Sequence, residues 1–102
     1  FCNRRRAYAF ETEGPANWMG RHFFTGGVMP SLGLFREFSA RLEVAASWEW
    51  SGKHYQRTAE AWLANYDRAR SAILPALRSV YGPGGERQFH RWRMFLLAVA
   101  EM

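Results

Sequence analysis

The fold of this chain is decided by the stretch WMGRHFFTGGVMPS, residues Trp18–Ser31. Asn17 stands directly before it, where it can cap one short helical turn. The centre of the stretch contains two adjacent phenylalanines and, after one threonine, two adjacent glycines. These residues are Phe23, Phe24, Gly26 and Gly27. Glycines relax the limits on the backbone dihedrals. The stretch therefore predicts an extended, aromatic-rich loop.

The segments on either side of this loop predict strands and a helix. Residues 1–10 are expected to be the tail of a strand, and the Glu-Gly-Pro run at residues 13–15 breaks regular structure. Ser31 is a candidate N-cap for a helix over residues 32–42, where apolar residues recur at helical spacing. Residues 44–50 place apolar side chains at alternate positions, which predicts a buried strand.

The second half of the chain carries apolar stripes that are typical of amphipathic helices. The first stripe predicts a helix over residues 55–74 that ends or kinks at Pro75, because proline cannot donate a backbone hydrogen bond. A weaker turn at residues 77–80 leads into a glycine- and proline-rich break at residues 81–85, and a last helix covers residues 89–99. Four tryptophans at helix or strand spacing are expected in the core. They are Trp48, Trp50, Trp62 and Trp92.

This order of elements indicates an α/β layer fold that is helix-rich, with at most two or three strands present. Two strands cannot cover the apolar faces of these helices, so a larger sheet is expected outside the chain. With 102 residues the chain is one domain at most. It begins at Phe1 and stops at Met102 within an apolar periodic segment, so both ends are expected to be cuts.

Composition and charge narrow the class of protein. Hydrophobic residues make up 48% of the chain, which excludes a disordered protein, and no run approaches the roughly 18 apolar residues of a membrane span. The net charge of +5 suits an acidic partner such as a phospholipid surface. The basic residues form no clustered face with stacking aromatics, so no nucleic-acid partner is expected. The single cysteine, Cys2, excludes an internal disulfide and indicates a cytoplasmic protein.

Several spaced motifs resemble one family of enzymes in the same order. The Trp18–Ser31 stretch resembles the tryptophan, paired aromatic, Gly-Gly and Pro-Ser segment of cyclopropane-fatty-acyl-phospholipid synthases. Its Phe-Phe-Thr-Gly-Gly-x-Met-Pro-Ser form is closer to the coclaurine N-methyltransferase-like branch of the same family. The resemblance continues through Trp48, Gly52, Lys53, His54, Tyr55, Thr58, Trp62, Leu63, Asp67, Tyr81, Gly82, Trp92, Arg93, Ala100 and Glu101.

The resemblance implies a class I, Rossmann-like methyltransferase that uses S-adenosylmethionine. No G-x-G turn follows an apolar strand here, so residues 1–102 would be a single partial domain: the substrate-side, C-terminal portion, without the cofactor-binding half. Alone it should be inactive. The first function expected is cyclopropane-synthase-like action on an unsaturated lipid acyl chain, in the cytoplasm or at the inner face of the membrane. The alternatives are N-methylation of a small amine and a non-catalytic basic module that docks on a membrane or another protein.

Three residues carry the catalytic and anion-binding expectations. Tyr55 matches the tyrosine that helps hold bicarbonate in the cyclopropane synthases, and Phe1 falls where the family offers a backbone group to the same anion. His54 is placed to move a proton near neutral pH. The competing interpretations are that Tyr55 merely opens the apolar stripe of its helix and that His54 is solvated at the helix start.

Aromatic residues carry the substrate-binding expectation. Trp18, Phe23 and Phe24 would line the substrate channel beside Gly26 and Gly27, because aromatic faces suit both an acyl chain and a positively charged amine or sulfonium. Core packing is the competing interpretation. No metal is expected: Glu86 and His90 share a helix face, but no third ligand stands at a recognisable spacing.

Overall fold

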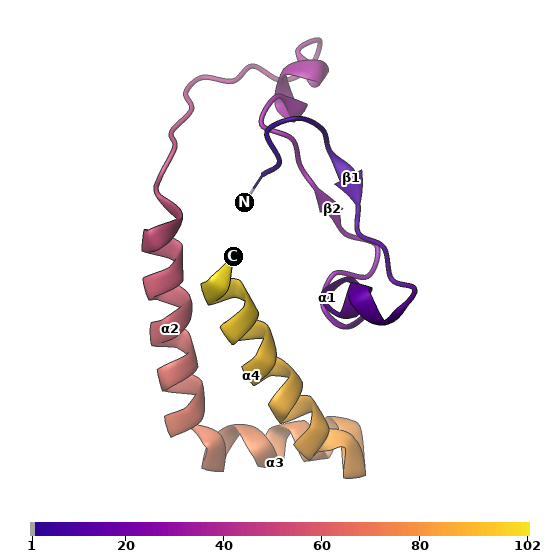
Figure 1. Ribbon diagram of the computed structural model, residues 1–102, viewed down its shortest axis with the longest axis vertical. Coiled ribbons are helices and arrows are strands. Elements are labelled where there is room, and N and C mark those ends of the chain that lie inside the picture. The colour runs from indigo at the N-terminus through magenta and orange to yellow at the C-terminus, as the bar shows by residue number, and fades with distance from the viewer. Residues whose placement is uncertain (1) are drawn as a thin grey trace. The chain divides into compact units, whose positions relative to one another are not determined.

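The computed structural model describes residues 2–102 and divides the chain into two compact units, Phe1–Trp48 and Glu49–Met102 (Figure 1). Phe1 itself lies outside the described residues. The first unit contains a small antiparallel sheet and the second contains three helices. The predicted helix-rich α/β character is therefore confirmed.

The first unit is built on two short strands, β1 (Tyr8–Ala9) and β2 (Val28–Met29). They pair antiparallel, with Tyr8 opposite Met29, and an isolated bridge joins Asn3 to Ser31. Between the strands lie a 3-10 turn, η1 (Pro15–Asn17), and the short helix α1 (Trp18–His22). The predicted strand and helical turn around the quoted stretch are thus confirmed. The Asn17 side chain does not cap α1 but donates to the Glu13 carbonyl at 2.6 Å.

Gly20 fixes how α1 approaches the chain that leaves β1. A Cβ at this buried position would lie 2.1 Å from the carbonyl oxygen of Glu11, far inside van der Waals contact. Only glycine allows this approach. Arg21 reinforces the same junction, because its Nε donates to the Thr12 carbonyl at 3.1 Å.

The helix predicted over residues 32–42 is wrong in extent. Only a 3-10 helix forms, η2 (Leu34–Phe38), and Gly33 rather than Ser31 precedes it. The apolar side chains of this segment remain largely exposed, with Phe35 at 62% and Phe38 at 56%. A short helix gains most of its stability by burying an apolar face, and this one buries little.

The strand predicted over residues 44–50 is also wrong in this structure. Residues 42–50 belong to no regular element, and the described sheet consists of β1 and β2. Trp48 and Trp50 are 69% and 76% exposed, so neither lies in a core. A strand is stable only when it forms backbone hydrogen bonds with neighbouring strands, and residues 44–50 pair with neither β1 nor β2.

The second unit consists of α2 (Gly52–Arg68), α3 (Arg70–Tyr81), η3 (Gly82–Gly84) and α4 (Gly85–Glu101). Helices α2 and α4 run side by side in opposite directions, and α3 connects them across one end (Figure 1). The buried hydrophobic side chains form a narrow seam among the three helices. They are Ala59, Leu74, Phe89, Leu96 and Val99.

The helix break falls earlier than predicted. The chain turns at Ala69, and α3 then runs through Pro75 without interruption. A proline inside a helix removes one hydrogen bond, here the one to the Ser71 carbonyl. Ser71 and Pro75 both line an open hollow on α3, so this turn of the helix is accessible to solvent. The predicted turn at residues 77–80 is part of α3, and the helix predicted over residues 89–99 is confirmed as α4.

Trp62 and Trp92 are not core residues either, with exposed fractions of 49% and 38%. The residue that α2 buries is instead the small Ala59. Among residues 2–102, none of the helices has the length and apolarity needed to cross a bilayer.

Candidate functional site

The predicted site residues fall into two groups, one in each unit. The first unit holds Trp18, Phe23, Phe24, Gly26 and Gly27, and the second holds His54 and Tyr55. Distances between side chains are therefore given within each unit. Phe1, the predicted backbone ligand of an anion, lies outside the described residues.

Trp18 and Phe23 form an aromatic cluster on α1. Their ring centroids are 5.4 Å apart, and the imidazole of His22 meets the Trp18 ring edge-on at 5.6 Å. All three side chains are half-buried. The structure thus adds His22 to the expected pair. Its spacing of four residues from Trp18 on a helix was the signal that could have found it.

Phe24 packs in a different direction. Its ring stacks on Phe10 with centroids 4.9 Å apart and an interplanar angle of 19°, and Phe10 in turn meets Tyr8 edge-on. These contacts bind the glycine turn to the strand β1. The structure therefore gives Phe24 a packing contact, as the competing interpretation allowed, whereas its role in lining a substrate channel remains a prediction.

Gly26 and Gly27 lie in a tight turn rather than an extended loop. Gly26 has a φ of +74°, which L side chains rarely adopt, and the Gly27 N–H donates to the Phe24 carbonyl at 2.8 Å. A Cβ on Gly27 would lie 3.0 Å from that same carbonyl oxygen. Thr25 closes the turn by donating its hydroxyl to the Arg21 carbonyl at 3.0 Å. The two glycines therefore let the backbone turn tightly directly after Phe24.

Asn3 ties the start of the chain to the end of the quoted stretch. Its N–H donates to the Pro30 carbonyl at 2.7 Å, and its carbonyl accepts from the Leu32 N–H at 2.9 Å. Its side-chain Oδ1 accepts from the Arg5 N–H at 2.8 Å and from the Arg6 N–H at 3.3 Å. Asn3 therefore organises the arginine-rich turn that follows it.

His54 and Tyr55 lie in the first turn of α2, beside Lys53. Ser51 caps this helix, because its Oγ accepts from the Lys53 N–H at 3.4 Å and its carbonyl accepts from the His54 N–H. All of these side chains are exposed. A helix N-terminus carries partial positive charge, and the Lys53 ammonium adds to it. This corner therefore favours an anion or an electron-rich group.

The Tyr55 ring is oriented by Trp62 on the same helix. The two rings meet edge-to-face with centroids 6.2 Å apart and an interplanar angle of 86°. Tyr55 is 39% exposed, so its hydroxyl lies within reach of solvent and of a bound molecule. Its phenol can donate or accept a hydrogen bond.

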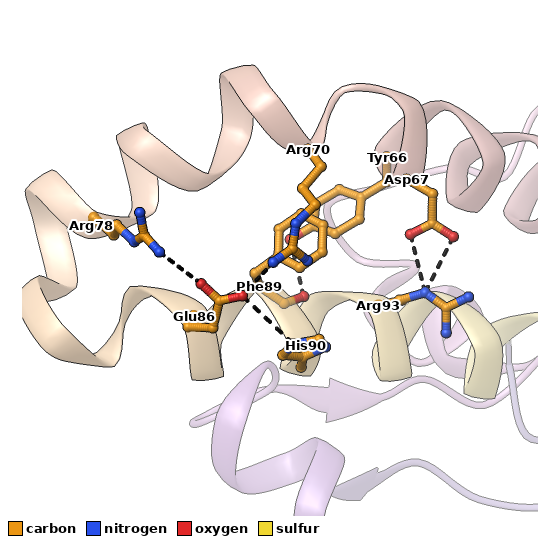
Figure 2. Close-up of polar contacts among 8 residues, drawn as sticks. All are labelled: Tyr66, Asp67, Arg70, Arg78, Glu86, Phe89, His90 and Arg93. Atoms are coloured by element: carbon orange, nitrogen blue, oxygen red, sulfur yellow. Dashed lines mark hydrogen bonds and ion pairs between the residues drawn. The ribbon is translucent and has the colours of Figure 1, made fainter.

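Sequence reasoning missed a polar cluster that joins α3 to α4 (Figure 2). The Glu86 carboxylate accepts hydrogen bonds from Arg70 and from Arg78, the latter at 3.0 Å from Nη2. His90 Nε2 lies 3.9 Å from Glu86 Oε1. The hydrogen bond from Arg70 is the main cause that holds the pKa of Glu86 below its usual value. Desolvation opposes it, and the charge of Arg70 together with the bond and charge of Arg78 adds to the lowering.

Phe89 stands next to this cluster and anchors α4 to α2 (Figure 2). Its ring stacks on Tyr66 with centroids 4.6 Å apart, and the Arg70 guanidinium lies 4.7 Å from its centre. The Tyr66 hydroxyl donates to the Phe89 carbonyl at 3.1 Å. Burial, and secondarily the charge of Asp67, raises the pKa of Tyr66. Further along α4, Arg93 Nε contacts both Asp67 carboxylate oxygens at 3.0 and 3.2 Å.

The described residues do not supply a cofactor-binding turn. The positive-φ glycines are Gly14, Gly26 and Gly82, and none of them opens a helix directly after a strand. Within residues 2–102, no group of three or more His, Cys, Asp or Glu side chains could hold a metal ion. The open hollow on α3, about 490 Å³ in volume, is lined by none of the predicted site residues.

These units have the fold of part of a methyltransferase. The crystal structure of coclaurine N-methyltransferase bound to N-methylheliamine and SAH matches this chain with a TM-score of 0.78 at 30% identity, covering 99% of this chain and 32% of that one. In sequence, the chain is 31% identical over 106 residues to (S)-coclaurine N-methyltransferase of Thalictrum flavum subsp. glaucum, which covers 99% of this chain and 29% of that protein. It is 29% identical over 105 residues to the (S)-coclaurine N-methyltransferase of Papaver somniferum, covering 99% and 30%.

The chain thus spans about a third of the length of the relatives it matches. No family model matches it. Its relatives carry the name of an N-methyltransferase, so the predicted resemblance to the methyltransferases is confirmed. The similarity to these relatives does not show that the chain belongs to the cyclopropane-fatty-acyl-phospholipid synthases.

Proposed function

We propose that this chain is the substrate-side part of an S-adenosylmethionine-dependent N-methyltransferase that acts on a small amine. The similarity to coclaurine N-methyltransferases along 99% of the chain carries the proposal. The solved relative holds an N-methylated amine together with SAH. This favours the amine alternative over lipid cyclopropanation, and it supports neither a lipid partner nor membrane contact.

The chemistry of an amine acceptor fits the side chains of this chain. S-adenosylmethionine supplies the methyl group in enzymes of this class, and residues outside this chain would bind it. An amine must be neutral for its nitrogen lone pair to attack, so a protonated amine first needs a base. The Trp18 and Phe23 faces would hold the apolar body of the amine and stabilise its positive charge.

His54 and Tyr55 are the proposed catalytic side chains. The His54 imidazole would act as the base that removes the proton of an ammonium group. The Tyr55 phenol would accept a hydrogen bond from the amine N–H and so orient its lone pair. An amine acceptor forms no carbocation, so neither bicarbonate nor an anion contact from Phe1 is required. A cytoplasmic location belongs to the proposal, because Cys2 is an exposed free thiol.

A chimeric enzyme tests this function. In it, residues 1–102 replace the matched region of the Thalictrum enzyme, and labelled S-adenosylmethionine is offered with either a panel of small secondary amines or vesicles of unsaturated phospholipid. The proposal predicts label in an N-methylated amine. Label in the lipid alone would favour cyclopropanation. A folded chimera that binds SAH and labels neither acceptor would contradict methyl transfer by this chain.

A further inference from the structure

The open hollow on α3 gathers positive charge that the proposed methyl transfer does not use. It has a volume of about 490 Å³ and is lined by the end of α2 and by α3, both in the second unit. The lining residues are Arg68, Arg70, Ser71, Leu74, Pro75 and Arg78. Three of these six are arginines, none is acidic, and Ser71 adds an exposed hydroxyl group.

The contacts of the three arginines leave most of their hydrogen-bond donors for a ligand. Arg68 donates through Nη2 to the side-chain oxygen of Asn65. Arg70 and Arg78 each donate through Nη2 to the Glu86 carboxylate (Figure 2). A guanidinium group has five N–H donors, so each of these bonds uses one donor out of five. The arginine side chains are also exposed, so a molecule from solution can reach them.

Positive charge exceeds negative charge around the hollow. Glu86 balances one of the three arginines, which leaves a net charge of +2. Asp67, next to Arg68 in the sequence, is held by Arg93 and compensates that residue instead. Like charges gathered at one place repel each other, and a bound anion with two negative charges relieves the repulsion. Ion pairing within the fold therefore does not account for all three arginines.

We propose that this hollow binds the phosphate group of a soluble molecule. A phosphate carries up to two negative charges, which matches the net charge of the hollow, and the planar guanidinium group can bind two of its oxygens at once. The Ser71 hydroxyl can donate a further hydrogen bond. Arg68 lies about 20 Å along α2 from Tyr55, so the phosphate site is separate from the predicted methylation site and goes beyond the proposed function.

Calorimetric titration with inorganic phosphate tests this site. The protein is the chimera described above, in which residues 1–102 stand in a complete fold, at about pH 8, where phosphate carries close to two negative charges. We expect saturable binding of one phosphate per chain that sodium chloride at the same ionic strength does not reproduce. Heats no larger than those with sodium chloride would overturn the proposal.

Two arginines of α2 provide a matched pair of variants. Arg68→Gln removes one charge from the hollow without breaking the ion pairs of Glu86, and it should weaken phosphate binding at least about fivefold. Arg57→Gln removes the same charge from an exposed position that does not line the hollow, and it should change the affinity by less than about twofold. Equal effects would show attraction by net charge alone and would overturn the site.

Glu86 provides a test in the opposite direction. Its carboxylate competes with phosphate for the Nη2 atoms of Arg70 and Arg78, so Glu86→Gln should tighten phosphate binding at least about threefold. If the arginines served only to join α3 to α4, the loss of their partner would not improve an anion site. Unchanged or weaker binding would therefore contradict the proposal.

Vesicles of phosphatidic acid distinguish a lipid headgroup from a soluble phosphate. If Arg68→Gln weakened vesicle binding but left the phosphate titration unchanged, the assignment to a soluble phosphate would be overturned. A chimera that binds phosphate but methylates no amine contradicts the proposed function alone, and an active chimera that binds no phosphate contradicts this site alone. If the chimera does not fold, the titration is made with the 102-residue chain, where absence of saturable binding overturns the site.

Discussion

At the scale of single residues, the best-defined contacts surround Phe89 and Glu86. Phe89 is 2% exposed and its ring stacks on Tyr66. The Glu86 carboxylate accepts hydrogen bonds from two arginines of α3. The helical stripe predicted that Phe89 faces a core. The sequence could not predict the partners, because Arg70 and Glu86 are sixteen positions apart and meet only because the chain turns at η3, between α3 and α4.

Replacing Phe89 tests its role as the anchor of α4. Phe89→Ala leaves a cavity and should lower the free energy of unfolding of the second unit by about 3–5 kcal/mol. The measurement is urea unfolding followed by the helical circular dichroism signal. Phe35→Ala, at a side chain that is largely exposed, should change the same quantity by less than about 0.5 kcal/mol. Similar losses in both variants would contradict the assigned core.

The pKa of Glu86 predicts how the second unit responds to acid. Its folded pKa lies below its usual value, so the stabilisation is fully present above that usual value and is lost as the pH falls through the folded pKa. We expect the melting temperature to fall between about pH 5 and pH 3, and Glu86→Gln to flatten this dependence. Glu37→Gln, in the first unit, is the matched control. An unchanged slope in Glu86→Gln would show that the ion pairs with Arg70 and Arg78 do not stabilise the fold.

Tyr55 is the site residue with the most specific proposed role. Tyr55→Phe keeps the ring against Trp62 but removes the hydroxyl, so we expect the chimera to lose at least about tenfold in kcat with little change in melting temperature. Tyr81→Phe, at an exposed tyrosine at the end of α3, should leave kcat unchanged. Equal kcat values for Tyr55→Phe and the parent chimera would remove Tyr55 from the site.

At the scale of elements, the helices of the second unit were predicted more accurately than the segments before them. Long stripes with regular spacing predicted α2 and α4, because such helices bury their own apolar faces against each other. The break at Ala69 has no proline or glycine to signal it, whereas Pro75 signals a break that does not form. Residues 32–42 were predicted from helical spacing and residues 44–50 from strand alternation, but within the described residues they bury too little apolar surface to become a full helix or a strand.

The junction of α3 and α4 depends on a glycine at one position but not at its neighbour. A Cβ on Gly85 would lie 2.8 Å from the backbone of Arg78, whereas a Cβ on Gly84 would make an ordinary contact with Tyr81 at 3.8 Å. Gly85→Ala should therefore destabilise the second unit by about 1–3 kcal/mol, and Gly84→Ala by less than about 0.5 kcal/mol. Urea unfolding of both variants measures the difference, and equal stabilities would contradict the close approach of the two helices.

At the scale of the whole molecule, the motifs of the sequence predicted which proteins this chain is similar to. The motifs from Trp18 to Glu101 indicated a methyltransferase, and the similarity to coclaurine N-methyltransferases agrees with them. Patterns of residues could not distinguish a lipid from an amine acceptor, since aromatic side chains suit both. They also could not predict that His22 joins Trp18 or that Phe24 stacks on Phe10, because tertiary packing decides these contacts.

The central claim is that this chain completes the substrate side of an N-methyltransferase. The most direct test is mass spectrometry of a small secondary amine incubated with S-adenosylmethionine and the chimera that carries residues 1–102. We predict that the amine gains one methyl group only when the cofactor and the chimera are both present, and that the isolated chain transfers none. An unmodified amine in the presence of a folded, SAH-binding chimera would contradict the claim.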